Sequence, residues 1–251
     1  MPEDRPEDVA LNNKTLVVEA DIHSLLFVAM RNFLSDGEVL LDVVKTVTCL
    51  AELSIVKNQC MVEGIHEVIL LGMEEHPDDP ILQELFLETI VVLSATDGMI
   101  DILCDAGILS FTVETMEKYS HIEAIQEKGT ILLQTVVNKK KSICDNRLAE
   151  KIARAIVSSM KKFRKAPNVL AESCVAMQFL ADLSQEVTKT LVNFNAHEEL
   201  FHILETYKSD ETLVNLVCEC LYILCCKWEF TTQMLGWACR KNLMKRPSNA
   251  C

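Results

Sequence analysis

A short acidic or polar segment recurs five times along the chain, and each copy is followed at once by an amphipathic apolar stretch. The copies are Val18–Ile22, Val62–Ile65, Cys104–Ile108, Cys144–Leu148 and Phe194–His197. Their first residues lie at positions 18, 62, 104, 144 and 194, so the successive steps are 44, 42, 40 and 50 residues. A period of about 40 to 47 residues is typical of stacked units of two or three helices, none of which is stable alone. The period therefore predicts an all-α solenoid.

The composition agrees with a helical protein. The 251 residues are 49% hydrophobic, which is enough for a large core, and a solenoid would bury it as one stacked array rather than as two globular domains. Only 7 glycines and 6 prolines are present, which leaves little turn chemistry for a hairpin-rich β protein. No uninterrupted apolar run approaches the roughly 18 residues that a membrane span requires. We therefore expect a soluble, cytoplasmic protein, with the nucleus as an additional compartment.

The eleven cysteines do not indicate a disulfide framework. Their number is odd, the N-terminus has no secretory signal peptide, and most of them lie inside apolar helical runs, as Cys49, Cys225 and Cys226 do. A free thiol in such a run behaves as a small hydrophobic side chain. The sequence thus predicts reduced cysteines in the core of a cytosolic or nuclear protein.

The first repeat is incomplete. Residues 1–13 are rich in proline and acidic residues and are expected to form a disordered tail. Lys14–Glu19 then aligns with Asn58–Glu63, which places the back half of a repeat directly after the tail. This half-unit either caps the array or continues a longer one. The expected boundaries are 14–35 for the half-unit, 36–77, 78–120, 121–165, 166–209 and 210–246 for about five units, and 247–251 for a second tail.

The segments Val62–Ile65 and Cys104–Ile108, each followed by a long apolar helix, resemble the turn before the last helix of an armadillo repeat. Gly64 and Gly107 would allow the sharp reversal there at little steric cost. The resemblance covers roughly residues 14–244 and extends to HEAT repeats, which share the period and the number of helices. It implies a right-handed armadillo-like α-solenoid whose last helices line a concave groove for extended peptides.

Two further features refine this resemblance. Nuclear-import members of the armadillo family line their groove with a ladder of Trp and Asn residues. This chain has only Trp228 and Trp237, neither on a matching groove helix, so binding of basic import signals is not expected. The general sequence pattern of the units also resembles the repeat arrays that are attached to large kinases and kinase-like proteins.

One segment has a charge opposite to that of the whole chain. Residues 138–167 contain ten basic and two acidic residues, a local charge of +8 in a chain of net charge −13. On an ideal helix, six of the cations fall on one side and the apolar residues Ile152, Ile156, Met160 and Phe163 fall on the other. The six are Arg147, Lys151, Arg154, Lys161, Lys162 and Lys165. Because like charges four residues apart destabilise a helix, we expect this basic face to bind an acidic or phosphorylated protein segment.

Other interpretations of the basic face remain open. It is equally well explained as the solvated side of a packed helix. Nucleic acid is a weaker alternative, because the net charge opposes binding and Phe163, the one aromatic residue of the segment, is expected to face the core. Lys139–Lys141 could serve as a nuclear localisation patch, although such short basic runs are common.

The sequence contains no pattern typical of an enzyme. His197 and His202 lie five residues apart, so a helix would place them about 140° apart, too far around for one metal ion. The cysteines between Cys218 and Cys226 do not share one helical face, and the isolated glycines form no phosphate-binding loop. We therefore predict no catalytic residues, no metal and no cofactor.

These observations predict a non-enzymatic protein–protein interaction scaffold that binds its partner along the groove of the unit 121–165. The alternative is a structural or regulatory array within a larger, kinase-like protein, where it would mediate intramolecular or dimer contacts. Solenoids serve many unrelated roles, so the fold alone does not choose between the two.

Overall fold

The computed structural model describes residues 6–140 and 145–227, and within these ranges every regular element is a helix. The chain forms two compact units that divide after residue 143. The first unit contains α1 (Pro6–Glu19), α2 (Ile22–Asn32), α3 (Gly37–Leu50), α4 (Ser54–Val62), α5 (Ile65–Glu75), α6 (Pro80–Leu93), α7 (Met99–Asp105), α8 (Ile108–Lys118) and α9 (Glu123–Lys139). The second contains α10 (Asn146–Lys162), α11 (Pro167–Leu183), α12 (Gln185–Asn193), α13 (Ala196–Thr206) and α14 (Glu211–Lys227). The predicted all-α solenoid class is confirmed.

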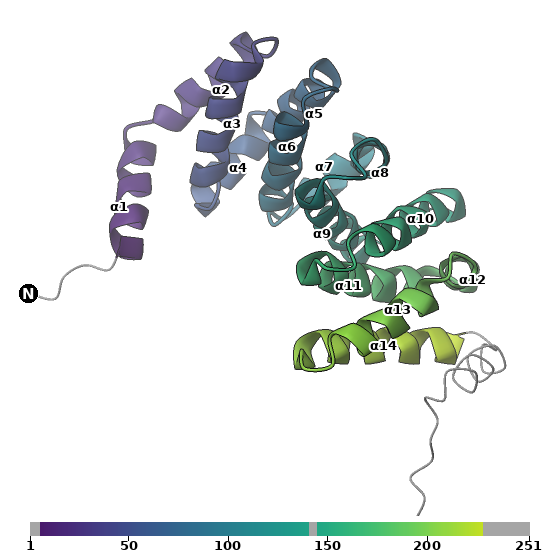
Figure 1. The fold of residues 1–251 in the computed structure, drawn as a ribbon. Helices are drawn as coiled ribbons and strands as arrows, with labels where there is room; N and C mark the ends of the chain where they lie inside the picture. The colour runs from purple at the N-terminus through teal and green to yellow at the C-terminus, as the bar shows by residue number, and fades with distance from the viewer. Residues whose placement is uncertain (1–5, 141–144, 228–251) are drawn as a thin grey trace, which may run out of the picture. The chain divides into compact units, whose positions relative to one another are not determined.

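Three kinds of helix alternate in the first unit (Figure 1). The long helices α3, α6 and α9 pack against one another in that order, and each also packs against the 11-residue helix before it, α2, α5 or α8. The shorter α4 and α7 connect one layer to the next. The expectation of a long helix directly after each recurring segment is wrong for these layers, because an 11-residue helix follows the segment and the longer helix comes after the next turn.

The starts of the long helices define the period more sharply than the recurring segments do. Residues 36, 79, 122 and 166 are the N-caps of α3, α6, α9 and α11, and residue 210 directly precedes α14, giving steps of 43, 43, 44 and 44. The carboxylates of Asp36, Asp79 and Asp210 accept hydrogen bonds from backbone N–H groups in the first turn of their helices. These starts lie at or next to the expected unit starts, whereas the grouping of helices into units remains a prediction.

A left-handed backbone residue directly precedes each of the four described 11-residue helices, α2, α5, α8 and α13. Asp21, Gly64, Gly107 and Asn195 have φ of 56°, 67°, 79° and 64°. Glycine adopts this conformation without strain, and Asn and Asp tolerate it better than other residues. The reversal predicted at Gly64 and Gly107 is confirmed, and the four positions follow the same period of 43 to 44 residues.

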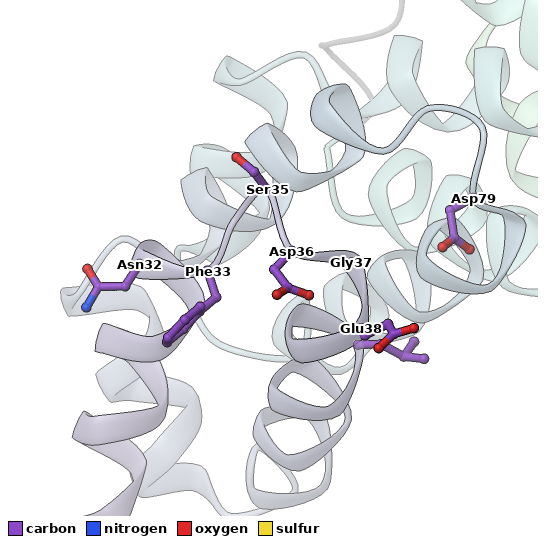
Figure 2. Close-up of a pocket in the computed structure, with 8 residues that line it drawn as sticks. Asn32, Phe33, Ser35, Asp36, Gly37, Glu38 and Asp79 are labelled. Atoms are coloured by element: carbon purple, nitrogen blue, oxygen red, sulfur yellow. The ribbon is translucent and has the colours of Figure 1, made fainter.

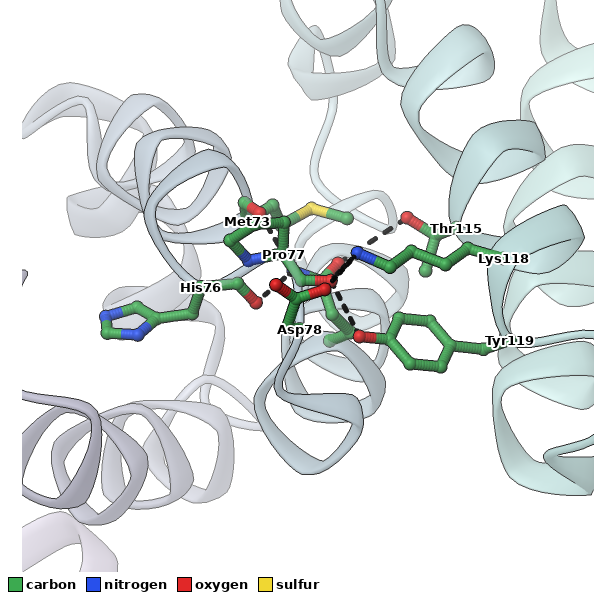
Figure 3. A network of polar contacts seen from close by, with 8 residues as sticks. Met73, His76, Pro77, Asp78, Thr115, Lys118 and Tyr119 are labelled. Carbon is green, nitrogen blue, oxygen red and sulfur yellow. Dashed lines mark hydrogen bonds and ion pairs between the residues drawn. The ribbon is translucent and has the colours of Figure 1, made fainter.

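Successive turns are tied together by polar rings. The Tyr119 hydroxyl donates to the carbonyl of Pro77 at 2.6 Å, and Nε2 of His76 lies 2.7 Å from the carbonyl oxygen of Leu34 (Figure 3 shows the first contact). In the second unit, the Tyr207 hydroxyl donates to the carbonyl of Arg164 at 3.1 Å. Each ring thus bonds to a carbonyl oxygen in the turn one repeat earlier, which gives that backbone group a hydrogen-bond partner.

Two buried glutamines also donate hydrogen bonds to backbone carbonyls, here at the ends of helices in their own layers. The Gln83 amide on α6 donates to the carbonyls of Met73 and His76 at the end of α5 (Figure 3), at 2.8 and 3.0 Å. Gln126, 43 residues later on α9, does the same for Met116 and Tyr119 at the end of α8. The ends of α5 and α8 are therefore fixed to the long helices that follow them, α6 and α9.

The N-terminal prediction needs a correction. The helix α1 begins at Pro6, so residues 6–13, expected to be part of a disordered tail, are helical. The composition of this segment predicted disorder, because it has little apolar surface to bury. Most of the α1 residues are indeed exposed, but α1 packs against α2, and this contact supports the helix. Residues 1–5, the tail 247–251, Trp228 and Trp237 lie outside the described residues.

The cysteine prediction holds for some positions and fails at others. All eight cysteines in the described ranges are free thiols, and Cys60, Cys174 and Cys220 are buried. Burial raises the pKa of Cys60 to about 12, so this thiol stays protonated and unreactive. Cys49 and Cys226, expected in the core, are exposed, because an apolar run predicts a helix without fixing which of its residues face outward.

Gly72 on α5 marks a close contact between helices. A Cβ atom there would lie 2.7 Å from Cζ of Phe86, a fully buried ring on α6. We predict that Gly72→Ala destabilises the protein by about 1–3 kcal/mol through overpacking, although alanine alone would favour a helix by ~1 kcal/mol. Urea unfolding measures the change. Gly37→Ala, whose nearest contact would be 3.6 Å, is the control and should be nearly neutral. A Gly72→Ala protein more stable than wild type would contradict the packing argument.

His66 on α5 should make stability depend on pH. Burial lowers the pKa of His66, against a weaker opposing effect of the Glu67 carboxylate, 3.9 Å away. Its folded pKa therefore lies below the unfolded value of about 6.5, so stability is complete above pH 6.5 and falls as the pH drops through the folded pKa. Leu109 occupies the same position of α8, 43 residues later. We predict that His66→Leu makes the loss of stability between pH 7.5 and 5 shallower in urea titrations; equal slopes would refute this role.

Candidate partner-binding face on helix α10

Helix α10 differs from its counterparts in length. The helices α2, α5, α8 and α13 each have 11 residues, whereas α10 has 17. The period places a left-handed residue near Lys151, 44 residues before Asn195, but α10 continues through that position. Residues 146–151 thus form an N-terminal extension of six residues that the other four helices lack.

The recurring segment Cys144–Leu148 is therefore not equivalent to the other four, and the prediction of five equivalent segments is wrong at this position. Asp145 has an extended backbone, with φ −63° and ψ 161°, and its carboxylate accepts the N–H of Leu148 at 2.7 Å. It is an ordinary N-cap rather than a left-handed turn. Aligning it with the other segments produced the irregular steps of 40 and 50 residues. Cys144 itself lies outside the described residues.

The structure places the six predicted cations on the surface. Arg147, Lys151, Arg154, Lys161, Lys162 and Lys165 are all exposed, and we call them the basic face. Ile152, Ile156 and Met160 lie on the opposite side of α10 and are fully buried, as predicted. Phe163 is only half-buried, because α10 ends at Lys162 and Phe163 is its C-cap. Lys165 consequently lies in the turn between α10 and α11 rather than on the helix.

Two cations of the basic face contact the turn between α12 and α13. The Arg154 guanidinium carbon lies 4.8 Å from the ring centroid of Phe194, within cation–π range. Lys161 Nζ donates to the carbonyl of Phe194 at 2.8 Å. Among the residues that the structure describes, Arg147, Lys151 and Lys165 make no hydrogen bond or ion pair, so their charges face solvent.

Arg164, also in the turn after α10, is held in a structural ion pair. Its Nε and Nη2 atoms donate to the two carboxylate oxygens of Glu199 on α13, both at 2.8 Å. The Glu199 side chain is only 3% exposed, so this pair compensates a buried charge. The hydrogen bond to Glu199 raises the pKa of Arg164. Arg164 therefore belongs to the fold and not to the binding face.

The histidines beside this face do not form a metal site. Burial lowers the pKa of His197 at the start of α13, although the Glu198 carboxylate raises this pKa and opposes the effect of burial. Nowhere in residues 6–140 and 145–227 do three or more His, Cys, Asp or Glu side chains gather closely enough to hold a metal ion. No described helix is long and apolar enough to cross a membrane.

A separate hollow in the first unit has the opposite charge. A cavity of about 600 Å³ between α2, α3 and the start of α6 is lined by Phe33 and by the carboxylates of Asp36, Glu38 and Asp79 (Figure 2). Two of these carboxylates already cap α3 and α6. The cavity is thus acidic and its carboxylates serve the helix ends, so it offers no site for an anionic ligand.

The basic face presents exposed cations on α10 and in the turn after it, next to one aromatic ring from a neighbouring turn. The sequence predicted the cations, but it did not reveal the contribution of Phe194, which lies 40 residues after Arg154.

Comparison with known proteins agrees with the fold. The crystal structure of an engineered protein from the Northeast Structural Genomics Consortium superposes with a TM-score of 0.65 at 16% sequence identity, covering 85% of this chain and 83% of that chain. A second engineered protein from the same consortium gives a TM-score of 0.47 at 16% identity, covering 79% and 57%. At such low identity the first likeness concerns the fold alone.

A family model described as the LRRK2 ARM repeat matches residues 12–149, more than half of the 251 residues. The match begins within α1 and ends within the extension of α10. It therefore covers the layers in which the period of 43 residues is most regular. The chain belongs to the LRRK2 ARM repeat family.

Proposed function

We propose that the chain is a non-enzymatic interaction scaffold that holds an acidic or phosphorylated segment of a partner protein on its basic face. The observation that carries this proposal is the set of solvent-facing cations on a helix extension that the other repeats lack. ARM repeats generally bind proteins, which supports the scaffold role. The family match ends at residue 149, so most of the basic face is a feature of this chain beyond the matched region.

The contacts of the remaining cations support the choice of residues. Lys139 donates to the carbonyl of Ser94, and Lys140 pairs with Asp101. Arg164 pairs with Glu199. These three cations have partners within the fold, whereas Arg147, Lys151 and Lys165 of the basic face make no hydrogen bond or ion pair among the described residues.

The helix tolerates repulsion within the basic face. Arg147 and Lys151 are four residues apart, and Lys151 and Arg154 are three apart, so their side chains are neighbours on the surface of α10. Glu150 is the one acidic residue of the helix. An arrangement of this kind destabilises an isolated helix by a few tenths of a kcal/mol per pair. Binding of an anionic segment would remove this cost.

Part of the basic face is already ordered before binding. The ring of Phe194 restrains Arg154, and the Phe194 carbonyl restrains Lys161. Side chains that are held in place lose less conformational entropy when they bind a ligand. A carboxylate or phosphate would therefore meet two positioned cations, Arg154 and Lys161, beside exposed cations of the same face.

The same arrangement favours protein over nucleic acid. Single-stranded nucleic acid binds through stacking on exposed aromatic rings as well as through charge. The Phe194 ring is already covered by Arg154, and the net charge of −13 repels a polyanion at long range. An acidic peptide segment needs only the local cations, because screening limits distant repulsion to about 8–10 Å at physiological salt.

We predict that Arg147→Glu with Lys151→Glu weakens binding of an acidic phosphoserine peptide about tenfold or more. Each exposed contact between a cation and a carboxylate contributes ~0.5–1 kcal/mol, and reversal adds repulsion. Fluorescence anisotropy in low salt, with a labelled peptide rich in Asp, Glu and phosphoserine, measures the effect. Arg154, Lys161 and Arg164 are left unchanged, because they contact Phe194 or Glu199 and their loss would disturb the fold.

The matched control is Lys57→Glu with Lys208→Glu, two lysines on other helices or turns. Both double variants change the net charge from −13 to −17, so a general charge effect would weaken both equally. Peptide binding that is unchanged in the α10 variant, or lost equally in the control, would reject the proposed face. Tighter binding of a single-stranded oligonucleotide than of the peptide would assign the face to nucleic acid instead.

A further inference from the structure

A second, smaller cavity lies inside the first unit, where α8 stacks next to α5 and α6. Its volume is about 190 Å³, and its lining comes from α5, α6, α8 and the turns that follow α5 and α8. Sites for whole small molecules usually measure about 300–1,000 Å³. The size of this cavity therefore suits a single side chain better than a complete ligand.

The lining of this cavity carries uncompensated negative charge. The exposed carboxylates of Glu74 and Glu114 line it and make no hydrogen bond or ion pair with any described residue. Lys118 also lines the cavity, but its ammonium group pairs with Asp78 at 2.7 Å and donates to the carbonyl of Pro77 (Figure 3). Three carboxylates and one ammonium group leave a local charge of −2. The cavity therefore attracts a cation.

A buried amide oxygen lies beside the same cavity. Gln83, which is 3% exposed, uses its amide N–H groups to bond to the carbonyls of Met73 and His76. Its Oε1 atom has one contact among the described residues, the Thr115 hydroxyl at 3.5 Å, which is long for an O–H···O bond of typically about 2.7–2.8 Å. Both Gln83 and Thr115 line the cavity. An amide oxygen accepts two hydrogen bonds, so Oε1 can take a donor from a ligand.

The preceding layer lacks these groups. Arg31, Leu40 and Leu71 lie 43 residues before Glu74, Gln83 and Glu114, at the equivalent positions. The helices α2, α3 and α5 pack against one another without a carboxylate or an amide at these places. The two acidic residues and the glutamine are therefore not a requirement of stacking, and they distinguish this cavity from its counterpart.

We propose that this cavity binds an arginine side chain of a partner protein. A guanidinium group has five N–H donors in a planar fork, which suits the carboxylates of Glu74 and Glu114 together with Oε1 of Gln83. The half-buried ring of Phe111 offers a surface on which a guanidinium stacks, and Met73 offers an apolar wall to its methylene groups. The ammonium group of lysine is more strongly hydrated and cannot stack in this way.

This arginine site is separate from the basic face and takes the opposite charge. The cavity involves α5, α6 and α8, whereas the basic face lies on α10 and in the turn after it. Loss of binding at one surface therefore leaves the other intact, and the two proposals can fail independently.

Methyl NMR of the full chain, titrated with capped tripeptides in low salt, tests the proposal. The probes are alanine tripeptides with arginine, lysine or citrulline in the centre; citrulline has the shape of arginine without its charge. The arginine peptide should shift the methyl signal of Met73 saturably. The citrulline peptide should bind about tenfold more weakly, because both carboxylates lose their ionic partner, and the lysine peptide should fall between the two.

Glu74→Gln with Glu114→Gln should weaken binding of the arginine peptide about five- to tenfold. The matched control is Glu75→Gln with Glu117→Gln, two exposed acidic residues of the same helices that do not line the cavity. Both double variants change the net charge from −13 to −11, so a general charge effect would weaken both equally. Because all four side chains are exposed, the variants should keep the unfolding midpoint of wild type.

Three results would each overturn the proposal. The first is a Met73 signal that does not shift saturably with the arginine peptide. The second is a citrulline peptide that binds as tightly, which would assign the cavity to a neutral side chain. The third is equal binding by the Glu74/Glu114 variant and the Glu75/Glu117 control.

Discussion

Within each compact unit, the layers of this protein stabilise one another by packing of their helices. The 11-residue and long helices bury their apolar faces against neighbouring helices, and the turn that joins them is fixed by a ring from the next repeat. His76, Tyr119 and Tyr207 hold carbonyls at intervals that match the period of the helix starts. These contacts give backbone carbonyls in the turns a hydrogen-bond partner from the next repeat. The period of 43 to 44 residues follows from the need to repeat this geometry.

The candidate binding surface arises where the repeat changes. A left-handed residue precedes each of the 11-residue helices α2, α5, α8 and α13. Helix α10, which comes between α8 and α13 in the chain, has no such residue at the equivalent position and extends six residues further at its N-terminus. This extension carries Arg147 and Lys151, which no described residue neutralises. The same layer uses Arg164 to compensate the buried Glu199. Cations that stabilise the fold and cations that face solvent thus lie within a few residues of one another, and only the contacts distinguish them.

Much of this organisation could be predicted from the sequence. The period is visible because Gly64 and Gly107 follow similar polar residues, and the capping residues Asp36 and Asp210 mark helix starts. The exposed side of α10 was predictable because its cations and its apolar residues alternate with the helical period. Other features lacked a local signal. Asp145 resembles the acidic residue of the other segments although it caps a helix with an extended backbone, and Phe194 meets Arg154 only through tertiary packing. Composition argued for disorder in residues 6–13, where contact between α1 and α2 instead supports a helix.

The extended basic surface exists only if α10 runs without interruption through the position where the other repeats turn. Backbone ¹³C chemical shifts of residues 145–162 in solution measure this, because they report helical and left-handed conformations residue by residue. Helical shifts are expected for every residue from Asn146 to Lys162, with Asp145 extended. A break near Lys151, with a left-handed residue and separate helices on either side, would show that the fourth repeat resembles the others and that the basic face has no extension to carry it.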